Sequence, residues 1–87
     1  MKKYIIINPI RKNKKYSVLV YDPIEKKYKY FLSFGDKRYQ HFKDQTPLKL
    51  YSHLDHNDIN RKKRYYSRHG ITNDINSALW WSNNFLW

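Results

Sequence analysis

The chain of 87 residues has no cysteine, only two glycines and only three prolines. Without cysteine, neither disulfides nor a cysteine metal site can stabilise so small a domain, so its stability must come from packing or from a partner. Because glycine and proline are scarce and the charges are dispersed among aromatic and β-branched residues, the composition argues against a disordered tail. We expect a single folded domain over residues 1–87.

Long apolar runs are also missing. The only apolar run near the start is Tyr4 to Ile7, far shorter than the core of a signal peptide or a membrane-spanning helix. We therefore expect a soluble protein with no membrane span, and the lack of cysteine fits a cytosolic, nuclear or intravirion setting.

Acidic residues are few. Seven Asp and Glu face 18 Lys and Arg, which gives a net charge of +11. Self-repulsion of this size favours a polyanionic partner, and nucleic acid, an acidic protein surface and an anionic membrane are all compatible with it. The last segment differs, since Thr72 to Trp87 contains no Lys or Arg.

What the sequence has in quantity is aromatic side chains: four Phe, nine Tyr and three Trp. A small core of large rings is expected. The first part of the chain is rich in β-forming residues, and Tyr16 to Tyr21 alternates with a period of two. Asp22-Pro23 opens a turn, so a hairpin is predicted across Asp22 to Lys27. The predicted strands are residues 3–10, 15–22 and 28–34, and Gly35 is expected to end the third.

The second part of the chain contains helix signals. Residues 35–57 show no sustained period and are predicted to form a long ordered loop, which in compact domains is usually functional or held by a partner. Asp58 and Gly70 are suitable residues to begin and end a helix over 58–69. A second helix is predicted over 74–83, capped by Thr72 or Asn73, with Ile75, Leu79 and Trp80 directed inward. The fold class is therefore α+β: a small antiparallel sheet, a long loop and two short C-terminal helices.

Three arginines recur at helical spacing. Arg61, Arg64 and Arg68 share one face, with Tyr65 beside them, which suits the binding of phosphates by guanidinium groups and stacking on bases. The alternative is a solvated face whose arginines pair with Asp55, Asp58 or Asp74. With Lys37 and Arg38, these residues form the predicted polyanion-binding or partner-binding set.

The sequence contains no clear catalytic or metal-binding motif. The run His53 to Asp58 contains ligand-type residues, but its spacing matches no metal motif, and aspartates before a helix act as caps. The candidate acids and bases, Asp36, His41, Asp44, His53 and His56, are not arranged in any recognised catalytic pattern. We expect no metal, no cofactor and no enzymatic activity, with a small nuclease as a remote alternative.

Three tryptophans near the end exceed what one short helix can hide. Trp80 and Trp81 point about 100° apart on a helix. Because tryptophan is enriched at binding hot spots, Trp80 is assigned to the core, and Trp81 and Trp87 are assigned as partner anchors.

Several segments together resemble a known family. They are a strand ending in Ser33-Phe34-Gly35 and running to Tyr39, the His-x-Asp patterns in His53 to Asp58, the Arg68-His69 pair, and Ala78 to Ser82 with the final Leu86-Trp87. This combination resembles short basic proteins of uncharacterised function encoded by large double-stranded DNA viruses. The resemblance implies a viral setting, and residence in the virion after assembly in the host cytoplasm or nucleus.

Two functions of different class follow. The first is a virion structural protein, a minor capsid or cementing component whose basic face contacts acidic capsid protein or packaged DNA and whose Trp-rich end docks on another subunit. The second is a free protein that binds DNA or RNA through backbone phosphates without sequence preference.

Overall fold

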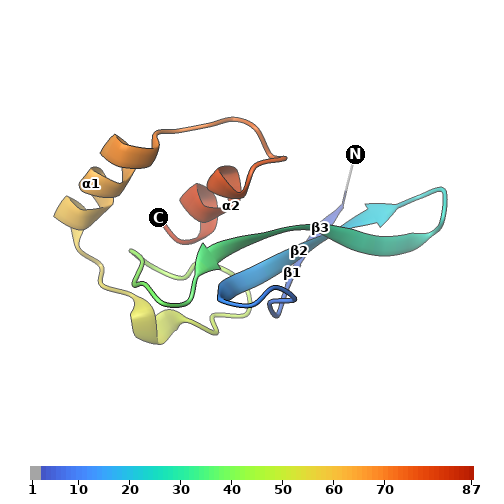
Figure 1. Cartoon of the computed structure of the whole chain (residues 1–87), viewed down its shortest axis with the longest axis horizontal. Coiled ribbons are helices and arrows are strands. Elements are labelled where there is room, and N and C mark those ends of the chain that lie inside the picture. The colour runs from blue at the N-terminus through green and yellow to red at the C-terminus, as the bar shows by residue number, and fades with distance from the viewer. Residues whose placement is uncertain (1–2) are drawn as a thin grey trace.

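The computed structural model describes residues 3–87, which form a three-stranded antiparallel sheet followed by two helices (Figure 1). The predicted α+β fold is confirmed. Strand order in the sheet is β1-β2-β3, so β2 is central. The elements are β1 (Tyr4–Ile7), β2 (Lys14–Asp22), β3 (Lys27–Asp36), a short 3-10 helix η1 (Ser52–Leu54), α1 (Ile59–His69) and α2 (Ala78–Phe85).

The β2–β3 hairpin forms where the sequence predicts it. The Asp22 carboxylate accepts a hydrogen bond from the backbone N–H of Ile24 at 2.9 Å, and Lys26 adopts a positive φ of 56° that completes the turn. The hairpin tip projects away from the helices, and α1 lies at the other end of the sheet (Figure 1). The molecule is correspondingly elongated, with extents of 45 × 25 × 20 Å.

Two strand ends differ from the prediction. β1 ends at Ile7 instead of residue 10; proline cannot donate to a strand ladder, and the Ile10 N–H donates to the Ser17 hydroxyl instead. β3 continues through Gly35 to Asp36. Gly35 has φ +75°, and a Cβ there would lie 2.9 Å from Leu86 Cδ1. The glycine therefore lets the end of the chain pack closely against the strand.

The core lies between the sheet and α2. Its fully or nearly buried apolar residues are Tyr16, Val18, Phe34, Trp81 and Leu86. The Phe34 and Trp81 rings lie 6.1 Å apart, which joins β3 to α2. As predicted from composition, large rings supply most of this core.

The long segment between β3 and α1 is organised around one buried carboxylate. Asp44 is 1% exposed. Its Oδ1 accepts hydrogen bonds from the N–H and hydroxyl of Thr46, and its Oδ2 accepts from the Tyr16 hydroxyl and the Tyr51 N–H. Burial opposes ionisation of Asp44, but these hydrogen bonds outweigh it and leave its pKa below the ordinary value. The loop is thus held by the protein's own central strand.

The second helix starts later than predicted. Ser77 is its N-cap, with the hydroxyl accepting from the Trp80 N–H at 3.2 Å. Before it, Thr72 and Asp74 side chains accept hydrogen bonds from backbone N–H groups two residues ahead of each. Such local side-chain bonds compete with helix formation, so the segment 72–76 turns instead of continuing the helix backwards.

Candidate functional site

Helix α1 begins and ends at the predicted residues. The Asp58 side chain accepts hydrogen bonds from the N–H groups of Asn60 and Arg61 at 2.9 and 3.3 Å. At the other end, the Gly70 N–H donates to the Tyr66 carbonyl at 2.8 Å, with Gly70 at φ +76°. These caps define where the helix begins and ends.

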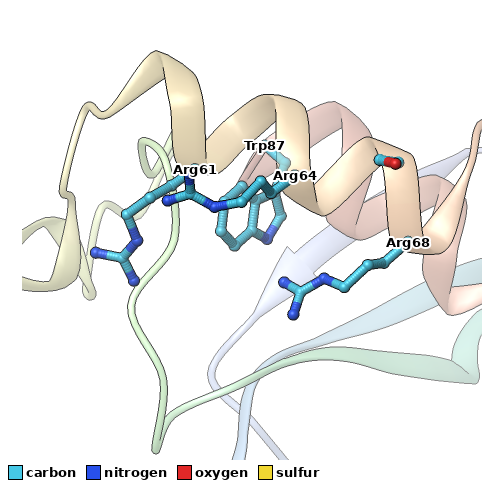
Figure 2. Close-up of a pocket in the computed structure, with 5 residues that line it drawn as sticks. Arg61, Arg64, Arg68 and Trp87 are labelled. Atoms are coloured by element: carbon cyan, nitrogen blue, oxygen red, sulfur yellow. The ribbon is translucent and has the colours of Figure 1, made fainter.

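Three arginines lie on one side of α1, as the spacing predicts. With Ser67 and Trp87 they surround a hollow of about 420 Å³, and all three leave the helix on the side that carries Trp87 (Figure 2). We call Arg61, Arg64 and Arg68 the arginine face. Arg61 Nη1 donates to Gln40 Oε1 at 2.8 Å, which brings the turn after β3 beside the helix.

The alternative of arginines paired to nearby aspartates is not what the structure shows. Within residues 3–87, the side chains of Arg64 and Arg68 form no hydrogen bond or salt bridge. The candidate carboxylates have other partners: Asp55 binds His41, while Asp58 and Asp74 accept from backbone N–H groups. Two guanidinium groups therefore present unused donors to whatever occupies the hollow.

Tyr65 is not available to stack on a base, and its assignment to the binding set is wrong. It is 7% exposed, and its ring lies parallel to the Trp87 indole at 4.2 Å. Burial raises the pKa of Tyr65 to about 12. The spacing of the Arg and Tyr residues correctly predicted that Tyr65 lies on the helix. It could not predict that Trp87, 22 residues later, would cover the Tyr65 ring.

Lys37 and Arg38, the other two basic residues of the predicted binding set, differ in whether their charge is paired. Lys37 is exposed. Arg38 forms a two-pronged pair with Asp36, at 3.0 Å from Nε and 2.7 Å from Nη2, and this pair lowers the pKa of the Asp36 carboxyl far below its usual range. Arg38 therefore contributes less free positive charge than the arginine face.

Trp81 is the more deeply buried residue of the pair, although Trp80 also packs against the core. Trp81 is 4% exposed and packs between Tyr4, Phe34 and Phe85, whereas Trp80 is half-buried. Ile75 lies before the helix, and its carbonyl accepts a hydrogen bond from Trp81 Nε1 at 2.9 Å. Trp81 is a core residue and not a partner anchor. Trp87 is half-buried and borders the arginine face.

A buried polar network on β2 was not predicted from the sequence. Lys15 Nζ lies 2.7 Å from His41 Nδ1, and His41 Nε2 lies 2.5 Å from Asp55 Oδ1. Burial and the nearby Lys15 charge lower the pKa of His41, so the neutral ring accepts from the ammonium and donates to Asp55. His41 and Asp44, both proposed as candidate acid-base residues, are at most 1% exposed and brace the loop. Residues 3–87 contain no group of three or more His, Asp or Glu suited to a metal ion.

The buried Lys15 makes the free energy of unfolding depend on pH in the alkaline range. Burial lowers its pKa from the ordinary value to about 8, so between about pH 8 and 10 the unfolded chain holds a proton that the folded protein releases. Stability should therefore rise over this range, by about 2 kcal/mol. Above about pH 10 it should fall again, because burial and its bond to Asp44 raise the pKa of Tyr16 to about 12.

Urea unfolding at several pH values measures this effect. Lys15→Met is the control, since it removes the titrating group and should abolish the rise between pH 8 and 10. An identical rise in wild type and Lys15→Met would show that another group is responsible.

Comparisons with known proteins add no assignment: no protein-family model, curated protein or solved structure matches this chain. The resemblance to short basic viral proteins therefore stays a prediction. Among residues 3–87, the structure contains no helix of the length and hydropathy needed to cross a bilayer.

Proposed function

We propose that the protein binds nucleic acid through its phosphate backbone, using the arginine face of α1. The observation that carries this proposal is the set of three arginines around one hollow, two of them without partners among the described residues. Guanidinium groups bind phosphate oxygens through paired N–H donors. The three side chains extend from one face of a formed helix, so the backbone does not need to rearrange for them to reach neighbouring phosphates.

Charge supports a polyanion as the partner. The net charge of +11 raises the local concentration of phosphates and speeds association. The sequence contains no recognised base-reading motif, so we expect affinity to depend on backbone charge and not on base sequence. This is a binding function without catalysis.

Paired variants of equal charge test the proposal. Arg64→Gln/Arg68→Gln removes two positive charges from the arginine face, and Lys26→Gln/Lys27→Gln removes two from the exposed hairpin tip. Fluorescence anisotropy with a labelled single-stranded DNA in about 100 mM salt should show a loss of at least about tenfold for the arginine variant. The lysine variant should lose much less.

The outcomes distinguish binding by the arginine face from binding by the total charge of the protein. Equal losses for the two variants would mean that total charge, and not the arginine face, determines affinity. No binding by wild type would reject the proposal outright. A strong preference for one DNA sequence would contradict backbone recognition.

A minor capsid or cementing role in a virion is the second candidate. It rests on the family resemblance and on one structural feature, the half-buried Trp80 beside an apolar hollow of about 490 Å³ that Ile5 and Pro47 also line. This surface differs in character from the arginine face, as expected of a component that joins two partners. The quantity of this protein in purified particles is the test: a fixed stoichiometry would support the role, and its absence would reject it.

A further inference from the structure

A second hollow continues inward from the arginine face. It has a volume of about 720 Å³ and opens between the start of β2, the end of β3 and the two helices. Arg61, Arg68 and Trp87 border both hollows, so a ligand on the arginine face lies at the mouth of this space. We call it the basic cleft. Its volume falls within the range of about 300–1,000 Å³ typical of sites for small organic ligands.

The walls of the basic cleft are cationic. Three basic side chains contribute positive charge to the lining, Lys14, Arg61 and Arg68, together with a single carboxylate, Asp36. Lys15 also lines the cleft, but it is 2% exposed and its Nζ is held by His41. Asp36 is already held by Arg38 at 2.7 Å, so it offers little repulsion to an anion. The cleft therefore suits a ligand that carries negative charge at its entrance.

The basic cleft also has apolar and aromatic side chains that are open to solvent. Ala78 is exposed and Leu79 and Trp87 are half-buried, and all three line the cleft. At the rim, the Tyr39 ring is 65% exposed and has the Arg38 guanidinium 5.8 Å from its centre. An open ring next to a cation is the arrangement on which bases of single strands stack.

These features together describe a site for a flat ring attached to a phosphate. We propose that the basic cleft takes in an unpaired nucleobase while the arginine face holds the adjoining phosphates, so that the protein prefers single-stranded to duplex nucleic acid. A base within a duplex is paired and stacked, and entering the cleft would require its extrusion, which costs energy. The proposal rests on the proposed function and adds which form of nucleic acid is bound.

An abasic strand isolates the contribution of the base. A thymidine oligonucleotide of about twelve residues is compared with a strand of equal length whose sugars carry no base. The two have the same phosphates, so the arginine face binds both. Wild type should bind the thymidine strand at least about tenfold more tightly. It should bind a duplex of the same length with an affinity close to that of the abasic strand.

Filling the cleft should remove this preference. Ala78 is exposed and lines the cleft, so Ala78→Trp places a large side chain there without touching the core. It should bring the thymidine and abasic affinities to within about twofold of each other, with abasic binding unchanged. Asn76→Trp, at an exposed position outside the cleft lining, is the matched control and should behave as wild type. Tyr39→Ala, at the rim, should reduce the preference independently.

The results distinguish the two proposals. If wild type binds thymidine and abasic strands equally, the cleft takes no base, although phosphate binding by the arginine face still stands. The same conclusion follows if the preference survives both Ala78→Trp and Tyr39→Ala. If neither strand binds, the proposed function itself is wrong.

Discussion

Replacing Asp44 with alanine should destabilise the protein by about 3–5 kcal/mol, because the change leaves buried donors without an acceptor. The carboxylate binds the Tyr16 hydroxyl at 2.6 Å and the Thr46 hydroxyl at 2.6 Å, besides two backbone N–H groups. Tyr16 in turn accepts from the Leu50 N–H at 2.8 Å. Loss of Asp44 therefore releases the loop from the central strand.

Urea unfolding followed by circular dichroism measures the change. Asp22→Ala is the matched control, since Asp22 accepts backbone bonds in the exposed hairpin turn and pairs with Lys29 at the surface. It should cost no more than about 1 kcal/mol. If Asp44→Ala were as mild as Asp22→Ala, the buried carboxylate would not be what orders the segment between β3 and α1.

Replacing Trp81 with alanine should cost a similar amount, about 3–5 kcal/mol. Its indole stacks on the Phe85 ring at 5.6 Å and meets the Tyr4 ring at 5.4 Å, and its Nε1–H donates to the Ile75 carbonyl at 2.9 Å. Removing it opens a cavity between the sheet and α2 and leaves that carbonyl unpaired.

Trp80→Ala is the control for this prediction, because the half-buried Trp80 loses less contact area on truncation. Thermal melts of the two variants should give the lower midpoint for Trp81→Ala. The opposite order would restore the interpretation that Trp80 is the core residue of the pair.

Local signals in the sequence were enough to predict the order and type of the elements. The alternation in Tyr16 to Tyr21 reports directly on a strand, and the caps at Asp58 and Gly70 act within one turn of the chain. The arginine face could also be predicted from the sequence, because residues three and four apart on a helix share a side.

Features that depend on distant parts of the chain were not predictable. Thr72 and Ser77 are both residue types that cap helices and lie five positions apart, and local sequence does not decide between them. Which of Trp80 and Trp81 is more deeply buried depends on how α2 packs on the sheet. The contact between Lys15 and His41 joins residues 26 positions apart, and no spacing rule connects them. Tyr65 was placed on the correct helix, but only the fold shows Trp87 stacked on it.

The burial of Trp81 and the free donors of the arginine face bear differently on the two proposed functions. With Trp81 in the core, one of the two anchors expected for a capsid partner is gone. The arginine face lines one hollow as predicted, and two of its three guanidinium groups have no partner within residues 3–87. The basic cleft behind it adds a second reason to expect nucleic acid as the ligand.

The salt dependence of DNA binding is the most direct test of the arginine face. The slope of log affinity against log salt counts the phosphates that a protein neutralises, at about 0.7–0.9 per contact. Arg64→Gln/Arg68→Gln removes two contacts and should make this slope shallower by about 1.4–1.8, while Lys26→Gln/Lys27→Gln should leave it near the wild-type value. Equal slopes for the two variants would contradict the account, because they would show that no particular set of side chains on α1 holds the phosphates.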